Sequence, residues 1–359
     1  SEIQLFPEPW AVDFNPRPAW NYTQGLIASS MIQVWKANGV ETYYNYAKKY
    51  ADQLIDSTGM ILAYKVENYN IDCLNPGKFL FDLYERTQDE RYLKAIQQLR
   101  DQLNTHPRTS EGGFWHKKRY PHQMWLDGLY MGAPFYAQYA VHFNQPELFD
   151  DIVKQFLLVN QHTYDPKTGL NYHGWDESKE QQWANPETGC SPNFWGRAMG
   201  WYAMALVDVL DFIPADHPGR AQILEILNQV AAGVKKYQDA ESGVWYQVLD
   251  QGNREGNYLE ATASSMFVYA LLKAVRLHYI DDSYREVALK GYDGLLKTFI
   301  KENENGTISL TRCCSVAGLG GNPYRDGSFE YYISEPVRDN DPKGVGPFIL
   351  ASLEIHMIQ

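Results

Sequence analysis

One stretch decides the fold of this chain: Asp239-Ala-Glu-Ser-Gly243-Val-Trp-Tyr246, an acidic turn that closes on glycine and runs into an aromatic stretch. The same pattern, a helical segment followed by a polar turn ending in glycine and then a short apolar stretch, occurs five times. The other turns end at Gly59, Gly112, Gly169 and Gly306, so that successive glycines lie 53, 57, 74 and 63 residues apart. A repeat of this period indicates one supersecondary unit used several times.

The segment before each turn has the pattern of an amphipathic helix. In the fifth repeat, apolar residues from Tyr284 to Phe299 recur every three or four positions and so share one face. Similar stripes run over 43–54, 92–103, 148–157 and 223–234. We expect these five segments to be outer helices with one face on a core.

Between them lie segments rich in Gly, Ala, Met and aromatic residues and nearly free of charge. These begin near Gly25, Gly77, Gly128, Gly196, Ala261 and Gly346. A helix that is apolar all round is buried on all sides. Six buried helices alternating with five or six amphipathic ones predict an all-α (α/α)6 barrel, a six-hairpin toroid with short strands and long loops at one end. A helical solenoid is the competing layout, but its repeats would be more even in length.

Length, composition and net charge limit the number of domains and the kinds of binding partner that we expect. The chain has 359 residues and a formal net charge of −12, so we expect neither nucleic acid nor an anionic membrane as a partner. Length alone suggests two or three domains. The repeat instead predicts a single catalytic domain over 1–359, with residues 1–19 as an N-terminal extension that packs on the barrel. Aromatic residues make up 14% of the chain, which calls for aromatic surfaces as well as a core.

The motifs that are missing also narrow the function. The four cysteines lack the spacing of a zinc site and are expected to be free thiols. We find no metal-binding, phosphate-binding or dinucleotide-binding motif, and we expect no metal and no cofactor. No apolar run is long enough for a membrane span, and the first residues lack the features of a signal peptide. We expect a monomer in the bacterial cytoplasm or periplasm, without a choice between the two.

A toroid places its chemistry at one end, where the N-termini of the inner helices converge and their partial positive charges favour anionic groups. Two carboxylates, Asp72 and Asp127, lie at the mouths of successive inner helices and are expected to face each other across a pocket. Paired carboxylates in an aromatic cleft suggest acid and base catalysis on a sugar. The alternative is that both residues are helix caps.

Asp127 has aromatic neighbours, Trp125 and Tyr130, and we expect this apolar wall to raise its pKa toward that of a general acid. Trp125, Trp195 and Trp201 lie near helix mouths beside polar residues, which suits stacking on a pyranose ring. The alternative for each tryptophan is a place in the core.

Three further polar residues lie in the same segments. His116 and His173 are candidates for substrate binding, with a structural role as the alternative. Arg197 begins a helix rich in small residues, and a buried guanidinium needs an anion, either a side chain or a ligand carboxylate. The glycine cluster Gly318-Leu-Gly-Gly321 is expected to be a turn.

Two longer runs carry a family resemblance. They read Trp115-His-Lys-Lys118 followed by His122-Gln-Met-Trp-Leu-Asp127-Gly-Leu-Tyr-Met-Gly132, and Trp183-Ala-Asn-Pro-Glu-Thr-Gly-Cys-Ser-Pro-Asn-Phe-Trp-Gly-Arg197-Ala-Met-Gly-Trp-Tyr202. They resemble the unsaturated rhamnogalacturonyl hydrolases of glycoside hydrolase family 105, from about Trp20 to Leu353. The resemblance implies an (α/α)6 barrel that removes the terminal 4,5-unsaturated galacturonyl residue left on rhamnogalacturonan fragments by pectin lyases.

The resemblance also implies roles for particular residues. Enzymes of this family hydrate a vinyl ether, with the Asp of the Trp-x-Asp motif, here Asp127, as general acid and base, and with Asp72 as the second important carboxylate. The family's substrate contacts fall on Tyr22, His116, Trp125, His173, Trp195, Arg197 and Trp201. The alternatives are an unsaturated glucuronyl hydrolase, a conventional inverting glycosidase, a sugar epimerase working through paired histidines, and a carbohydrate-binding protein without catalysis.

Overall fold

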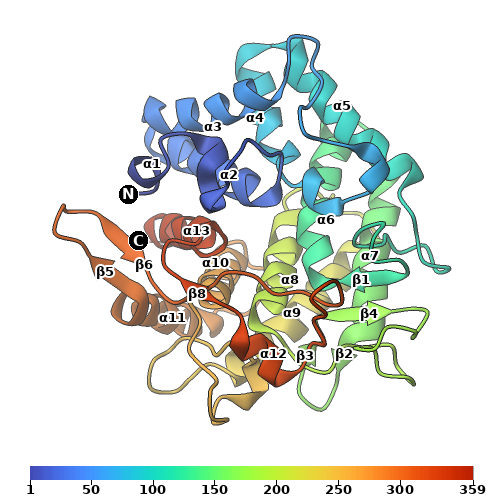
Figure 1. Ribbon diagram of the computed structural model, residues 1–359, viewed down its shortest axis with the longest axis vertical. Helices are drawn as coiled ribbons and strands as arrows, with labels where there is room; N and C mark the ends of the chain where they lie inside the picture. Colours follow the sequence, from blue (N-terminus) through green and yellow to red (C-terminus); the bar gives the residue numbers. More distant parts are fainter. Residues whose placement is uncertain (359) are drawn as a thin grey trace.

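The computed structural model describes residues 1–358, and most of them are helical (Figure 1). Six helices form an inner ring: α2 (Tyr22–Asn38), α4 (Gly77–Thr87), α6 (Leu126–His142), α8 (Gly196–Val209), α10 (Ala261–Arg276) and α13 (Pro342–Ile358). Five lie outside it: α3 (Glu41–Leu54), α5 (Glu90–Thr105), α7 (Leu148–Thr163), α9 (Arg220–Lys236) and α11 (Tyr284–Phe299). Inner and outer helices alternate along the chain, and the predicted (α/α)6 barrel is confirmed.

The inner ring closes on itself. Each inner helix packs on the next, and α13, the last, packs on both α10 and α2. Gly346 allows α13 to approach α2 closely, because a Cβ there would lie 2.6 Å from Cγ of Leu26 in α2. Ser30 Oγ lies 3.3 Å from the carbonyl oxygen of Gly346. A solenoid has two free ends, so this closure excludes it.

Each turn glycine of the repeat has a positive φ, between 76° and 97°, which only glycine adopts without strain. Four of the turns pack on the outer helix of the following repeat. A Cβ at Gly243, for example, would lie 2.6 Å from the carbonyl oxygen of Lys290 in α11. Around Gly306, the last turn glycine, no atom of residues 1–358 beyond its chain neighbours lies within 4 Å of such a Cβ. The last repeat therefore has no outer helix ahead of it.

The N-terminal segment lies beside α13, where a sixth outer helix would be (Figure 1). It consists of a short helix, α1 (Glu2–Leu5), and a 3-10 segment, η1 (Pro9–Phe14). An apolar cluster joins it to α2 and α3: Phe6, Val12, Ile27, Met31 and Tyr46. Tyr46 Oη donates a hydrogen bond to the Phe6 carbonyl at 2.7 Å. The barrel thus has five complete helical hairpins, and the sixth expected hairpin is replaced by α13 and this segment.

Short strands form four antiparallel pairs at the helix ends. The pairs are β1 (Gln123–Trp125) with β4 (Gly174–Asp176), β2 (Tyr164–Asp165) with β3 (Leu170–Asn171), β5 (Ile300–Glu302) with β6 (Ile308–Leu310), and β7 (Cys313–Cys314) with β8 (Val337–Arg338). The remaining elements are η2 (Val66–Asn68), η3 (Ile71–Leu74), η4 (Leu249–Gln251) and α12 (Phe329–Ser334). The register of β1 with β4 pairs Trp125 with Gly174, which brings the start of α6 beside His173.

The four cysteines are free thiols, as predicted. Among residues 1–358, no helix combines the length and the apolar character that crossing a bilayer requires. The same residues contain no cluster of three or more His, Cys, Asp or Glu side chains arranged to hold a metal ion.

Candidate active site

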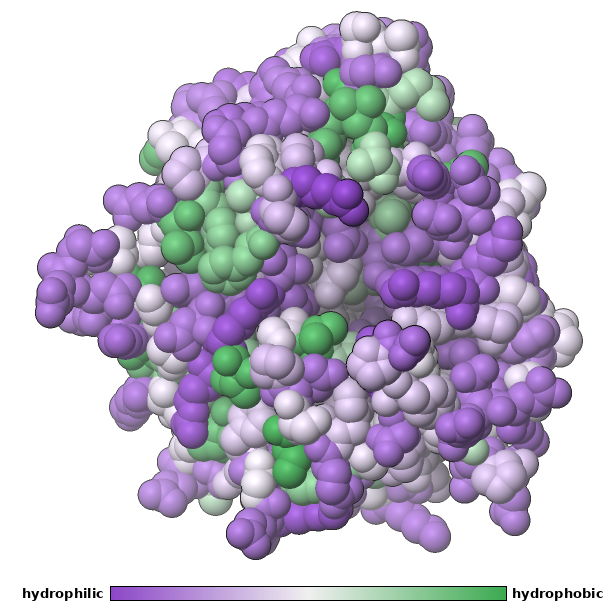
Figure 2. Space-filling view, viewed as in Figure 1, coloured by the Kyte–Doolittle hydropathy of each residue, from purple (hydrophilic) through white to green (hydrophobic). Residues whose placement is uncertain are grey.

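The residues singled out in the sequence gather at the end of the ring where the inner helices begin. The face seen in Figure 2 is hollowed near its centre, and polar side chains surround much of the hollow. This hollow lies over the region in which α6 and α8 are drawn in Figure 1.

Asp127 lies in the first turn of α6, held beside His173 by the pairing of β1 and β4. The amide of Leu126 donates a hydrogen bond to the carbonyl of His173 at 3.0 Å, which fixes the helix start to the strand end. Asp127 Oδ2 lies 3.2 Å from His173 Nε2, within ion-pair distance but not aligned as a hydrogen bond. Nδ1 of His173 lies 2.7 Å from Oη of Tyr332. The imidazole is fully buried, so each ring nitrogen faces one protein group.

The pKa of Asp127 is lowered from its ordinary value, and the expectation of a raised pKa is wrong for the ligand-free protein. Burial, the largest single effect, does raise it, as the aromatic neighbours predict. The electrostatic effect of His173, whose Nε2 lies 3.2 Å from the carboxylate, and a smaller contribution from His116 together outweigh burial. The sequence shows the aromatic neighbours of Asp127 but not the histidine that strand pairing brings to it.

Asp72 lies in η3, the turn before α4. One carboxylate oxygen pairs with Nζ of Lys117 at 2.5 Å, and the other lies 3.6 Å from Nε2 of His116. The cap of η3 is Asn70, whose side chain accepts a hydrogen bond from the amide of Asp72. The residue at the cap position of α6 is Trp125. Neither candidate carboxylate is therefore a helix cap, and the capping alternative is wrong.

His116 connects Asp72 to the start of α6. Its ring stacks on that of Trp125, with centroids 4.4 Å apart and planes at 15°. A Cβ at Gly128, the residue after Asp127, would lie 3.1 Å from its Nδ1, so this glycine lets the imidazole approach the helix. Burial lowers the pKa of His116 to about 4, although Asp72 acts in the opposite direction. At neutral pH, His116 is therefore an uncharged ring, and its Nδ1 has no hydrogen-bond partner among the described residues.

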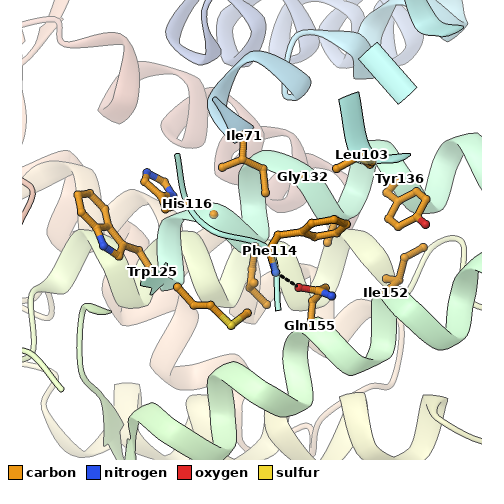
Figure 3. A pocket seen from close by; sticks show the side chains of 13 residues that line it. Ile71, Leu103, Phe114, His116, Trp125, Gly132, Tyr136, Ile152 and Gln155 are labelled. Carbon is orange, nitrogen blue, oxygen red and sulfur yellow. Dashed lines mark hydrogen bonds between the residues drawn. The ribbon is translucent and has the colours of Figure 1, made fainter. Parts of the chain in front are cut away.

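A small apolar cavity of about 20 Å³ lies behind this stack, between His116 and Trp125 on one side and Tyr136 and Ile152 on the other (Figure 3). The side chain of Gln155 closes it by accepting a hydrogen bond from the amide of Phe114 at 2.8 Å. The volume suffices for about one water molecule, but the walls are apolar. The cavity is a packing gap behind the site.

Arg197 lies buried in the first turn of α8. Its guanidinium donates a hydrogen bond to the carbonyl of Cys314 at 2.6 Å and lies 4.8 Å from the ring centre of Trp195. It forms no salt bridge within 4.0 Å to any carboxylate of residues 1–358. Burial lowers the pKa of Arg197, but nearby negative groups, among them Asp341 and Glu260, outweigh it and raise the pKa. The pairing of Arg197 with an acidic side chain is not realised, which leaves a ligand anion as the other interpretation.

The three tryptophans are buried, which agrees with their core role and leaves stacking on sugar a prediction. Trp195 stacks on Tyr332 at 5.7 Å. Trp201 stacks on Tyr130 at 4.9 Å and meets the edge of Tyr22 at 6.0 Å. Tyr130 also lines a larger cavity of about 900 Å³ toward the far ends of the inner helices, whose other walls include the ion pairs of Lys273 with Asp208 and Asp211.

Five residues at the site were not predicted from the sequence: Lys117, Tyr120, Leu319, Arg325 and Tyr332. Tyr120 stacks on Trp125 at 4.9 Å, and Arg325 donates a hydrogen bond to Tyr120 Oη at 2.7 Å. Leu319, in the glycine cluster expected to be a turn, is buried in the same aromatic group. Lys117 adjoins His116 in the quoted motif and was within reach of sequence reasoning. The others lie in stretches without periodicity, and only the fold brings them to the site.

A closed (α/α)6 ring with two carboxylates, buried histidines and an aromatic lining at the converging helix ends is an arrangement typical of glycoside hydrolases. Comparison with known proteins agrees with this class. The chain belongs to glycosyl hydrolase family 88, because the model of that family matches residues 1–359.

The relatives span a range of similarity. Protein Atu3128 of Agrobacterium fabrum strain C58 is 44% identical over 230 residues, which are 62% of this chain and 97% of that protein. The unsaturated rhamnogalacturonyl hydrolase YesR of Bacillus subtilis strain 168 is 27% identical over 266 residues, which are 72% of each chain. The solved structure of a family 105 glycoside hydrolase from C. acetobutylicum ATCC 824 has a TM-score of 0.94 at 49% identity, covering 99% of this chain and 100% of that one. The resemblance to family 105 is confirmed, and the protein is a glycosidase.

Proposed function

We propose that the protein removes the terminal 4,5-unsaturated galacturonyl residue from short rhamnogalacturonan fragments by hydrating its vinyl ether. The observation that carries the proposal is the pair of unlike carboxylates: Asp127 faces a histidine, whereas Asp72 is paired with Lys117. A carboxyl that exchanges a proton and a carboxylate that stays charged are the two groups this reaction needs. The similarity to YesR supports the choice of substrate.

In the first step, the Asp127 carboxyl gives its proton to C4 of the C4=C5 double bond. The electron pair of that bond forms the new C–H bond, and positive charge develops at C5 and the ring oxygen. Asp72, as an anion beside Lys117, stabilises this charge.

In the second step, the Asp127 carboxylate takes a proton from a water molecule, whose oxygen bonds to C5. The resulting hemiketal opens at its bond to the ring oxygen and leaves a ketone at C5. C1 is now a hemiacetal and expels the remaining sugar as it becomes an aldehyde. One water molecule is consumed, and Asp127 ends protonated, ready for the next cycle.

Arg197 is the proposed partner of the substrate carboxylate. Its guanidinium forms one hydrogen bond, to a neutral carbonyl, and no salt bridge to an acidic side chain of the described residues. An Arg–carboxylate pair is short, directional and stronger than a neutral hydrogen bond. Because the net charge of −12 repels anions at long range, a local cation is needed to hold this substrate.

The test follows the double bond. With a lyase-generated unsaturated disaccharide, we expect ultraviolet absorbance to disappear as free sugar is released. Sugar release with persistent absorbance would establish a conventional inverting glycosidase, with Asp127 as acid and Asp72 as base. A panel of unsaturated galacturonyl and glucuronyl disaccharides decides between these two uronyl substrates.

Asp127→Asn is the matched variant, because the amide has the shape of the carboxyl but carries no transferable acid proton. We expect activity to fall about 10²–10⁴-fold while substrate binding persists. Near-normal turnover in Asp127→Asn, with turnover abolished by His116→Ala and His173→Ala, would indicate the epimerase alternative. Binding without turnover in the unmodified protein would indicate a carbohydrate-binding function.

A further inference from the structure

Tyr332 contacts the ring nitrogen of His173 that does not face Asp127. It comes from α12, and its side chain is fully buried. Its ring stacks on Trp195 with the planes at 17°, and its backbone carbonyl accepts a hydrogen bond from Gln247 Nε2 at 3.1 Å. These contacts hold the hydroxyl 2.7 Å from Nδ1 of His173.

The hydroxyl hydrogen of Tyr332 has one acceptor. Within residues 1–358, the hydroxyl forms its only hydrogen bond with Nδ1 of His173. Burial raises the pKa of Tyr332 well above its ordinary value, so the hydroxyl keeps its proton. When this O–H donates to Nδ1, the neutral imidazole carries its own proton on Nε2, which faces Asp127 Oδ2. The other tautomer would turn a lone pair toward the carboxylate and leave the hydroxyl hydrogen without an acceptor.

We propose that Tyr332 is a positioning residue that sets the tautomer of His173 and thereby directs an N–H group at the carboxylate of Asp127. The proposal rests on the function proposed above, in which Asp127 passes from acid to carboxylate. The N–H group then stabilises the anion formed as the proton leaves for the sugar. The pair is not aligned in the ligand-free protein, and catalytic hydrogen bonds of this kind commonly tighten when substrate binds.

Other titratable groups lie around this chain of contacts. His116 acts on Asp127 and is uncharged at neutral pH, because burial lowers its pKa to about 4. The groups that act on Tyr332 are Tyr331, Asp127, Arg325 and Asp326. None of them forms a hydrogen bond with a ring nitrogen of His173, so the tautomer depends on Tyr332 and Asp127 alone.

Tyr332→Phe keeps the aromatic stack and removes only the hydroxyl. We expect kcat to fall about 10-fold, which corresponds to one hydrogen bond, with little change in KM. We also expect the basic limb of the kcat profile to move to higher pH, because Asp127 without an N–H donor keeps its proton further up the scale. Tyr331→Phe is the matched control: its hydroxyl accepts a hydrogen bond from the amide of Gly318 at 3.0 Å and does not contact His173. It should keep the kcat and the pH profile of the unmodified enzyme.

Nitrogen-15 spectra of histidine-labelled protein read the tautomer without any substrate, with the His173 signals identified by their loss in His173→Gln. We expect the proton on Nε2 in the unmodified protein and a shift toward Nδ1 in Tyr332→Phe. A proton on Nδ1 in the unmodified protein, or an unchanged tautomer and pH profile in Tyr332→Phe, would overturn the inference even in an active enzyme. Failure to consume any unsaturated disaccharide would overturn the proposed function instead, while the spectra would still decide the tautomer.

Discussion

Lys117 is the cation that pairs with Asp72, and replacing it tests how far the site depends on that pair. Lys117→Met keeps a long, flexible side chain and removes the ammonium group. The Asp72 carboxylate, with 8% of its side chain exposed, is then left facing His116. That imidazole cannot replace the lost charge at neutral pH, because burial lowers its pKa to about 4.

The structure sets the size of the effect. Removing one partner of a buried ion pair costs about 3–5 kcal/mol. The Lys117 side chain is 14% exposed, so we expect the lower end, about 3 kcal/mol of unfolding free energy at pH 7. An unpaired buried carboxylate is costly only while it is charged. We therefore expect the full deficit at pH 7 and a smaller one toward pH 4, where protonation removes the unpaired charge.

Urea unfolding at several pH values between 4 and 7 measures this loss of stability. Steady-state kinetics measures the effect on catalysis: we expect kcat to fall about 10²–10³-fold, because Asp72 no longer stabilises the positive charge that develops on the sugar. Lys118→Met is the control, because the Lys118 side chain is exposed and forms no salt bridge with a carboxylate of the described residues. Its Nζ lies 3.4 Å from the carbonyl of Glu67 and 5.8 Å from the ring centre of Tyr69. A Lys117→Met protein as stable as the parent at pH 7, or a deficit that does not change with pH, would show that the site does not depend on this ion pair.

Three further predictions follow from the same contacts. The carboxylate of the bound substrate should raise the pKa of Asp127 in the complex. The loss of kcat at high pH should therefore begin at a higher pH than the loss of kcat/KM, which reports the free enzyme; the same pH for both would contradict the prediction. In Gly128→Ala, the new methyl group pushes His116 by a few tenths of an ångström, and kcat/KM should fall about 10-fold. Because alanine favours the helix by about 1 kcal/mol, urea unfolding should show little loss of stability, and an unfolded or fully active protein would count against this prediction. Arg197→Met should weaken the binding of an unsaturated uronide at least about 10-fold, as measured by calorimetry in the Asp127→Asn background. Unchanged affinity would show that Arg197 does not bind the substrate carboxylate.

The fold could be predicted because its signals are local. The turn glycines, the amphipathic stripes and the uncharged inner segments each lie within about 20 residues of sequence, and the helices appear where those patterns lie. The absence of a sixth outer helix could not be predicted from such local patterns. The N-terminal segment takes its place through packing on α2, α3 and α13, and its own sequence has no stripe to show it.

Some residues of the candidate site could likewise be predicted from local sequence, whereas others depend on the fold. Asp127 and Arg197 were recognisable because they lie in the two motif runs, and Asp72 because it directly precedes an uncharged inner segment. The predicted direction of the Asp127 pKa shift was wrong because the pairing of β1 with β4 places His173 beside the Asp127 carboxylate. Tyr332 could not be found at all, since α12 lies in a long stretch without periodicity and its place behind His173 depends on the whole ring being closed.

Closure of the ring by its last helix has a consequence for the growing polypeptide. Ser30 of α2 and Gly346 of α13 are in contact across 316 residues of chain. A ribosome adding about 5–20 residues per second needs roughly 16–60 seconds to make that stretch. Throughout this time α2 has emerged, but the apolar surface that will receive α13 has nothing to cover it. The helix α2, made long before α13, is thus among the last to reach its final surroundings, and that uncovered surface is where a chaperone would act on the nascent protein.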